Sequence, residues 1–103
     1  MTAYCSYDLR VYTDFDTELT RVVDRLRMMP MTKLAVSAEL AFRTASQLLD
    51  LTPGSHPTLP RLADRAAGDQ LAVIGQDFRA AANDEAAVTE ATAALVELRR
   101  ALP

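Results

Sequence analysis

The one histidine of the chain, His56, is the first residue to consider for catalysis. It stands between Ser55 and Pro57 in a polar stretch. A catalytic histidine needs a nucleophile or a carboxylate positioned beside it, and nothing nearby in the sequence points to such a partner. Zinc is equally poorly supported, because His56 and the single cysteine, Cys5, would have to recruit carboxylates as further ligands. We therefore expect no catalytic residue, no metal and no cofactor.

Three acidic residues near the N-terminus alternate along the chain, as the ligands of a metal-binding loop do. Asp14, Asp16 and Glu18 occur in the segment "TDFDTE". A calcium loop of the EF-hand type also needs a central glycine and a distal glutamate at fixed spacing, and this segment has neither. Acidic side chains are favoured in the first turn of a helix, because they interact well with its dipole. The sequence therefore predicts a helix start here and no metal site.

Several arginines lie in the N-terminal region, and two of them are spaced to share one face of a helix. Arg21 and Arg25 are four residues apart, so their charges repel unless an anion lies between them. One hypothesis is a site for an anionic ligand lined by Arg21, Arg25 and His56. The alternative is a solvated face of mixed charge, because Glu18 and Asp24 each precede an arginine by three residues.

The segment from Leu62 to Phe78, "LADRAAGDQLAVIGQDF", resembles a helix-turn-helix with Gly68 at its turn. The resemblance implies a recognition helix from Asp69 to Ala80. That helix carries one arginine and two aspartates, whereas a helix in a DNA groove needs several donors to bases and phosphates. The net charge of -3 also disfavours a basic face for nucleic acid. We expect no binding to nucleic acid.

Most of the chain has the spacing of amphipathic helices, with apolar residues at steps of three and four. The segments with this spacing are residues 14–29, 33–51, 59–82 and 85–102. Between the second and third, the stretch "TPGSHPTLP" at residues 52–60 contains three prolines and a glycine, which block both helix and strand. We interpret it as a crossover loop within a single helical domain that covers residues 1–103.

A few residues mark where these helices begin and end. Thr13 and Thr32 are the expected N-caps of the first two helices, and Pro30 ends the first. Gly68 followed by Asp69 suits a C-cap and an N-cap, which predicts a break inside the third segment. The sequence therefore predicts a bundle of four or five helices.

The second helical segment is apolar on two sides. Its main stripe includes Ala38 and Ala45, whereas Val36, Leu40 and Leu51 lie roughly 120° or more from the centre of that stripe at 100° per residue. A helix that is apolar on two sides lies in the middle of a bundle or at an interface. We expect Val36, Leu40 and Leu51 to contact a partner.

The N-terminal arm, residues 1–13, has the pattern of a strand from residue 3 to residue 11. One face of this strand would carry Cys5, Tyr7, Leu9 and Val11. Alternation with a period of two, in a segment with tyrosine and valine, is typical of a half-buried strand. The alternative is a helix that uses the spacing of Tyr4, Tyr7 and Val11.

A strand needs a neighbour for its backbone hydrogen bonds, and the chain offers no good one. Residues 70–75 are the other candidate strand, but Phe78 and Ala81 continue their spacing as a helix. We therefore predict a homodimer in which two copies of the N-terminal strand pair about a two-fold axis. Strand addition to a different protein is the alternative.

The composition fits one small globular domain. The chain has 103 residues, of which 50% are hydrophobic. No apolar run approaches the roughly 20 residues of a membrane span, and "MTAYCSYDLR" lacks the basic start and apolar block of a secretory signal. Cys5 has no second cysteine with which to form an internal disulfide. A cytoplasmic protein with no membrane contact is the expectation.

Taken together, these patterns predict an all-α bundle with a short N-terminal strand that pairs across a dimer. The expected function is that of a non-enzymatic interaction or regulatory module, which acts through the N-terminal strand and the second helix. The first alternative is a small helical enzyme or anionic-ligand binder with an arginine-lined pocket at the dimer interface. The second alternative is a helix-turn-helix DNA-binding protein.

Overall fold

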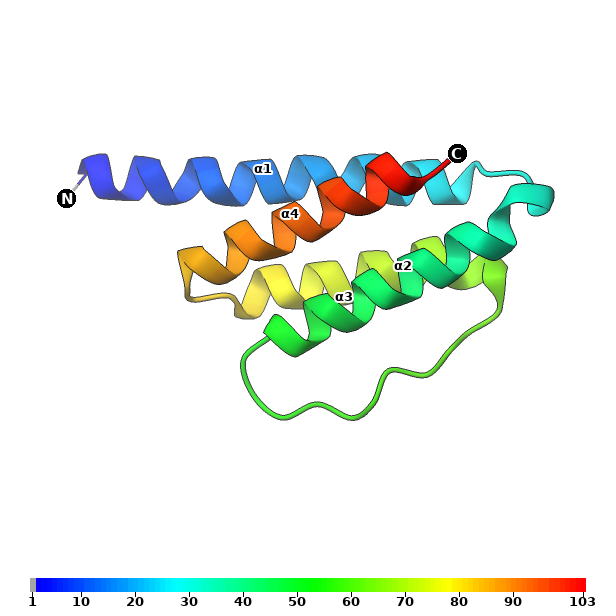
Figure 1. Ribbon diagram of the computed structural model, residues 1–103. Helices are drawn as coiled ribbons and strands as arrows, with labels where there is room; N and C mark the ends of the chain where they lie inside the picture. Colours follow the sequence, from blue (N-terminus) through cyan, green and yellow to red (C-terminus); the bar gives the residue numbers. More distant parts are fainter. Residues whose placement is uncertain (1) are drawn as a thin grey trace.

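The computed structural model describes the backbone of residues 2–103 and the side chains of residues 10–103. All regular structure in this part of the chain is helical (Figure 1). The elements are α1 Thr2–Arg27, α2 Met31–Leu51, the 3₁₀-helix η1 Asp64–Ala66, α3 Ala67–Ala81 and α4 Glu85–Ala101. The predicted all-α helical bundle is confirmed, with four α-helices.

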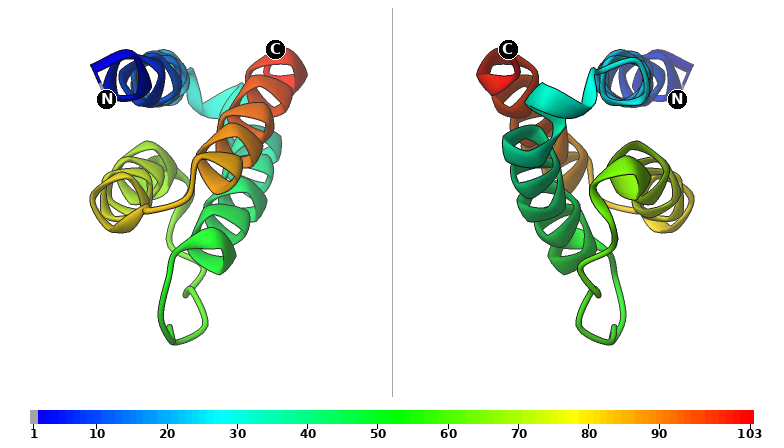
Figure 2. Two further views of the ribbon diagram at one scale, coloured as in Figure 1. Left: turned by 90° about the vertical axis from the view of Figure 1, so that its left-hand side faces the viewer. Right: turned by 90° about the vertical axis from the view of Figure 1, so that its right-hand side faces the viewer.

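The helices are arranged so that α1 and α2 lie diagonally opposite each other. α1 packs against α3 and α4, and α2 packs against the same two helices; Figure 2 shows the bundle from its two ends. α1 and α4 run in one direction, and α2 and α3 run in the other (Figure 1). Because consecutive helices α2 and α3 are parallel, residues 52–63 return along the length of the bundle.

The core is built from the apolar stripes that the helical spacing predicts. Phe15 of α1 and Phe78 of α3 are both fully buried, and their ring centroids lie 5.3 Å apart in a tilted pair. Leucines, valines and alanines from all four helices surround this pair: Leu19, Val22, Leu26, Ala38, Ala41, Leu48, Leu71, Val88, Ala91 and Leu95. The alanines of α2 and α4 allow these helices to approach closely.

The predicted N-terminal strand is wrong at the residues where the structure tests it. α1 begins at Thr2, and Arg10 and Val11, at the end of the predicted strand, are helical. Val11 is half-buried and packs on the core one turn before Phe15, so the helical stripe continues through it. The side chains of Cys5, Tyr7 and Leu9 lie outside the described residues.

Tyr12 fastens this part of α1 to the end of α3. Its hydroxyl donates a hydrogen bond to the carbonyl oxygen of Ala82, at 3.2 Å. The guanidinium of Arg79 lies 4.2 Å from the centroid of the Tyr12 ring and forms an ion pair with Asp16 at 3.1 Å. A cation over an aromatic face is attracted by the ring quadrupole. These contacts favour continuation of the helix over an extended arm at this position.

The break predicted at Gly68 and Asp69 is absent. Both residues lie inside α3, which follows η1 directly. Gly68 is buried against α1, where an added Cβ atom would lie 3.1 Å from Cγ of Arg27 and 3.5 Å from the carbonyl oxygen of Val23. The glycine therefore permits close helix packing and forms no turn. The segment is one α-helix after a 3₁₀ turn, so the two helices of a helix-turn-helix are not formed.

The predicted N-caps of the first two helices are also wrong. Thr13 lies inside α1, because that helix begins upstream of it. Thr32 lies in the first turn of α2, and Pro30 occupies the cap position without a side-chain hydrogen bond. Proline is compatible with a helix start, because its fixed φ, here -64°, suits the approach to the first turn. At α4 the carboxylate of Asp84 accepts from the backbone N–H of Ala86 at 3.1 Å.

Candidate functional site

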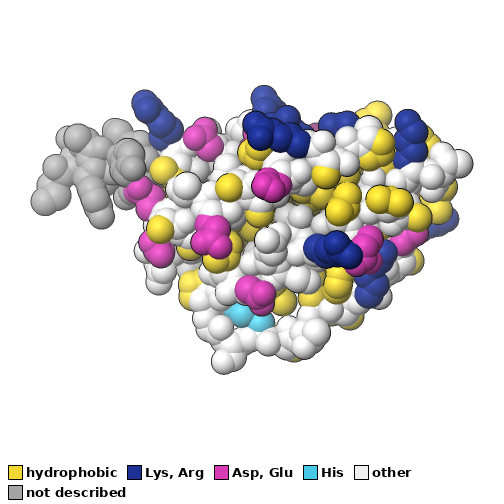
Figure 3. Space-filling view, viewed as in Figure 1, with side chains coloured by type: hydrophobic (Ala, Val, Ile, Leu, Met, Phe, Trp, Pro, Cys, Tyr) yellow, Lys and Arg dark blue, Asp and Glu magenta, His cyan; other side chains and the backbone are white. Residues whose placement is uncertain are grey.

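A groove with a volume of about 580 Å³ lies between α2 and α4. Its apolar floor comes from Leu40 and Leu51 of α2, which are half-buried, and from Leu98 of α4, which is buried. Acidic and basic side chains stand around this floor: Arg43, Asp50, Glu90 and Glu97. Figure 3 shows this face of the molecule, where hydrophobic side chains lie between charged ones over α2 and α4.

The groove has the length and the walls to receive a helix. Its lining runs from Leu40 to Leu51 on α2 and from Glu90 to Ala101 on α4, which is about 17 Å at 1.5 Å per residue. The α4 wall is made of small side chains at Ala94 and Ala101, which permit close approach of another backbone. The groove therefore has room for roughly three turns of a docked helix.

The interface residues predicted on the second helix lie along this groove. Leu40 and Leu51 line it, and Val36 precedes Leu40 by one turn on the same side of α2. Val36 is 70% exposed, so the apolar strip extends beyond the end of the groove. The structure brings the three residues to one face, and their role in binding a partner stays a prediction.

The carboxylates of the molecule fall into two groups. Several that face a neighbouring helix are paired with an arginine of that helix: Asp16 with Arg79, Glu18 with Arg99, and Asp69 with Arg27. By contrast, Asp50, Glu90 and Glu97 form no ion pair or hydrogen bond with any residue whose side chain the structure describes. The same holds for Asp14, Asp24 and Asp77, which lie elsewhere on the surface. The groove therefore has a rim of negative charge that the rest of the bundle leaves uncompensated.

A second, shallower groove of about 450 Å³ lies on the other side of α4, against α1. Val11 and Asp14 of α1 line it, and it shares Ala93 and Glu97 with the first groove. α4 is therefore a low ridge between two grooves. Asp14 adds a carboxylate on the α1 wall, and Arg100 adds a positive charge on the α4 wall. Val11, a predicted interface residue, thus lies in this second groove.

The two arginines of the hypothetical anion site make contacts within the bundle. Arg21 forms an ion pair with Glu18 at 3.4 Å. Arg25 donates from Nη2 to the carbonyl oxygen of Leu102 at 3.2 Å, which ties the end of α4 to α1. Both guanidinium groups are solvent-exposed. A ligand that used them would compete with these contacts.

His56 lies far from that pair in the fold. It belongs to the loop after α2, and its Nε2 atom lies 3.0 Å from the carbonyl oxygen of Thr52. It lines a small pocket of about 200 Å³ with Asp50 and Ser46. Figure 3 shows the histidine at the loop edge of the molecule, away from α1. The structure does not bring His56 together with Arg21 and Arg25.

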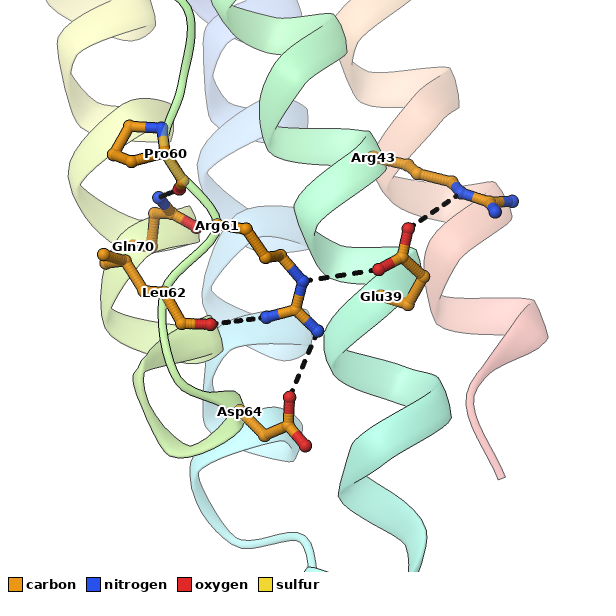
Figure 4. A network of polar contacts seen from close by, with 7 residues as sticks. All are labelled: Glu39, Arg43, Pro60, Arg61, Leu62, Asp64 and Gln70. Atoms are coloured by element: carbon orange, nitrogen blue, oxygen red, sulfur yellow. Dashed lines mark hydrogen bonds and ion pairs between the residues drawn. The ribbon is translucent and has the colours of Figure 1, made fainter.

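Arg61 anchors the last part of the long loop, and no pattern in the sequence predicts this role. Its Nε atom donates to Glu39 of α2 at 3.3 Å, and Nη2 donates to Asp64 at 3.1 Å (Figure 4). The side-chain amide of Gln70 donates to the carbonyl oxygen of Pro60 at 2.9 Å. The hydrogen bond to Asp64 is the main reason why the pKa of Arg61 is raised above its ordinary value. This network explains why residues 59–63, predicted as helix, are held as loop.

Different signals in the sequence mark these features. The partner of Arg61 on α2 is 22 residues away, so no local pattern could have found it. Glu90 is different, because alanines occupy the positions three and four residues before and after it. A helical glutamate with no basic residue at those positions has no partner on its own helix. The lack of basic residues around Glu90 therefore indicates, from the sequence alone, that its charge is not compensated within its own helix.

The described residues contain no group of three or more His, Cys, Asp or Glu side chains that could hold a metal ion. Among the same residues, no helix is both long enough and apolar enough to cross a membrane. No known family model matches the chain, and neither curated proteins nor solved structures provide a significant match. The functional argument therefore rests on the groove itself.

Proposed function

We propose that the protein is a non-enzymatic interaction module that receives a partner in the groove between α2 and α4. The observation that carries this proposal is the combination of a leucine floor with a rim of carboxylates that have no partner in the described part of the bundle. Apolar surface framed by polar groups is the usual anatomy of a protein interface. Val36, 70% exposed beside Leu40, enlarges the apolar area.

The competing proposal of an enzyme or anionic-ligand binder has less support. Catalysis needs an acid, base or nucleophile positioned next to a reacting atom, and the one described histidine is bonded to loop carbonyls. Arg21 and Arg25 face Glu18 and the carbonyl oxygen of Leu102. An anion would have to displace these contacts in order to bind.

A homodimer through residues 3–11 is part of the same proposal, but not by strand pairing at Arg10 and Val11, which are helical. Its contacts would involve residues 3–11, so it leaves the groove open for a different molecule. One register of a two-fold dimer through α4 is disfavoured, because an axis between Ala93 and Ala94 would place Glu90 opposite Glu97 of the second copy. Like charges directly opposite each other across an interface are destabilising.

Site-specific photo-crosslinking in the source cells tests the module. In one variant a photoreactive residue replaces Gln47, which lines the groove and is exposed. In a second variant of the same chain it replaces Gln76, which is exposed on α3. We expect a discrete adduct from position 47 and none from position 76. The adduct should disappear with Leu40→Glu, which puts a charge on the apolar floor.

Val73→Glu is the matched control for this substitution, because Val73 is an exposed apolar residue of α3, outside the groove. The adduct from position 47 should survive it. Equal labelling from positions 47 and 76, or an adduct that survives Leu40→Glu, would contradict the proposal.

A further inference from the structure

We infer that the occupant of the α2/α4 groove is a basic amphipathic helix of a different protein. This inference rests on the proposed function and specifies the chemistry of the partner. Helix-in-groove recognition buries an apolar stripe of the ligand at positions i, i+3 or i+4, and i+7. The flanking polar positions of such a ligand then face the rim, where charge decides which partners are accepted.

The shape of the groove sets the size of the ligand. α2 and α4 run antiparallel, and their walls extend for about 17 Å. Three apolar side chains of a docked helix, spaced over about two turns, can lie over Leu40, Leu51 and Leu98. The alanines on α4 lower one wall, so that the ligand can approach the floor. A helix of roughly three to four turns fits this surface.

The negative charge of the rim determines the charge that a ligand should carry. Asp50 stands on the α2 side and Glu90 and Glu97 stand on the α4 side, so that carboxylates flank the floor on both edges. The basic side chain of this rim, Arg43, is already bonded to Glu39 at 3.4 Å. Lysines or arginines on both edges of the ligand stripe would therefore meet carboxylates that no described residue compensates.

An acidic or neutral ligand fits this rim less well. Like charges brought together at a rim cost free energy, and a neutral helix leaves the carboxylates beside an apolar surface without compensation. The same reasoning disfavours a second copy of the chain in any register that brings its Glu90 and Glu97 to this rim. The apolar floor supplies the area, and the rim selects a basic partner.

The probe for this inference is a synthetic helical peptide of about four turns, composed of leucine and lysine with the leucines on one face. It carries a fluorophore, and its binding to the full chain is measured by fluorescence anisotropy. One control peptide has the same composition in an order that disperses the leucines, and another has glutamate in place of lysine. We expect binding of the first peptide, which weakens with added salt, and little binding of either control.

Two double variants with the same net charge distinguish binding in the groove from non-specific electrostatic attraction of the peptide to an acidic protein. Glu90→Lys with Glu97→Lys reverses the rim, and Asp24→Lys with Asp77→Lys reverses two exposed carboxylates that lie outside the grooves. We expect the rim variant to bind the lysine peptide about tenfold or more weakly and to gain binding of the glutamate peptide. The Asp24 and Asp77 variant should bind the lysine peptide within about threefold of the wild type.

The outcomes separate this inference from the proposed function. Equal weakening in both double variants, or binding that survives Leu40→Glu, shows attraction outside the groove and overturns the inference. If the lysine peptide does not bind while the position-47 adduct forms and disappears with Leu40→Glu, the groove has a partner of other chemistry, and the inference alone is wrong. Absence of both the adduct and peptide binding contradicts the function and the inference together.

Discussion

Gly75 shows how closely α3 approaches α1. A Cβ atom added there would lie 2.7 Å from both δ-methyl carbons of Leu19, and Leu19 is itself buried in the core. Gly75→Ala gains about 1 kcal/mol of helix propensity, but overpacking a core costs about 1–3 kcal/mol. We expect the variant to lower the free energy of unfolding by about 1 kcal/mol in urea denaturation.

Introducing Gly75→Ala into a second variant tests whether the contact with Leu19 causes this decrease in the free energy of unfolding. Leu19→Ala removes the methyl groups that meet the new Cβ atom, so Gly75→Ala should be neutral or stabilising when it is introduced into Leu19→Ala. If Gly75→Ala is destabilising by the same amount in both backgrounds, the contact with Leu19 is not its cause.

Glu18 is the carboxylate where the loss of one partner should cost most. Its side chain is 13% exposed and pairs with Arg99 of α4 at 2.8 Å. Arg99→Met keeps the aliphatic stem and should lower the free energy of unfolding by about 1–2 kcal/mol, because Glu18 loses a charge-assisted hydrogen bond between helices. Arg43→Met is the control, since the exposed Arg43–Glu39 pair should contribute less than about 0.5 kcal/mol. Equal losses in thermal or urea denaturation would contradict this ranking.

The sequence predicts some of these residues and not others, for a physical reason. Phe15, Leu19 and Val22 are found by spacing, because burial follows the period of the helix. Glu18 lies 81 residues from Arg99, and that pairing depends on how α1 and α4 are packed. The role of Gly75 is equally invisible, since a glycine in a helix gives the same signal whether it marks a break or a close contact.

Among the elements, the long loop is held in its last part mainly by Arg61, together with Gln70. Arg61 binds Glu39 and Asp64 while the loop passes outside α2 and α3 (Figure 4). Arg61→Met should lower the heteronuclear ¹⁵N NOE of residues 56–62, which reports faster motion on the ps–ns timescale. Global stability should be nearly unchanged, because both ion pairs are solvent-exposed.

The pH dependence of this effect follows from the direction of the pKa shift. The hydrogen bond with Asp64 raises the pKa of Arg61, so any stabilisation linked to the arginine is present below its ordinary value and is lost only above its raised value. The change in NOE should therefore be the same at about pH 7 and pH 9. Arg65→Met, on the neighbouring exposed arginine, is the control and should leave the loop unchanged.

The N-terminal helix shows why an element can be misread. Tyr4, Tyr7 and Val11 fit a helix, while alternate residues of the same segment fit a strand, so a nine-residue window cannot decide between them. What decides at the described end is tertiary: Val11 packs on the core, and Tyr12 bonds to the carbonyl oxygen of Ala82. Those contacts are with helices far along the chain, which local spacing does not report.

In the molecule as a whole, the groove between α2 and α4 arises from the order in which the helices pack. The sequence predicts an apolar second side of α2, with Val36 and Leu40. It does not predict that α4 lies beside that side, because the long loop leaves the order of the helices open. The acidic rim exists only once α2 and α4 are neighbours. The candidate site was therefore half predictable: the apolar residues and the missing helix partner of Glu90 could be found, but the position of the carboxylates beside the apolar residues could not.

The last prediction concerns how copies of the molecule associate. The first described side chains that pack on the core are Val11 and Tyr12, so removal of residues 1–9 should leave the bundle folded. The removed segment carries Cys5, Tyr7 and Leu9, the residues predicted to contact a second copy. We expect light scattering to show a dimer for the full chain and a monomer for the truncated one, with circular dichroism losing no more helical signal than the removed residues contribute.

Comparison with Leu40→Glu assigns the contact to one surface. If residues 3–11 hold the dimer, Leu40→Glu should leave it intact, because the charge lies in the groove on the α2/α4 face. The truncated monomer should still bind the leucine–lysine peptide, because none of the removed residues lines the groove between α2 and α4. A dimer that survives the truncation but dissociates with Leu40→Glu would place self-association in the groove. In that case the two copies would have to bring Glu90 and Glu97 near one another, and the dimer should weaken at low salt, where their repulsion is least screened.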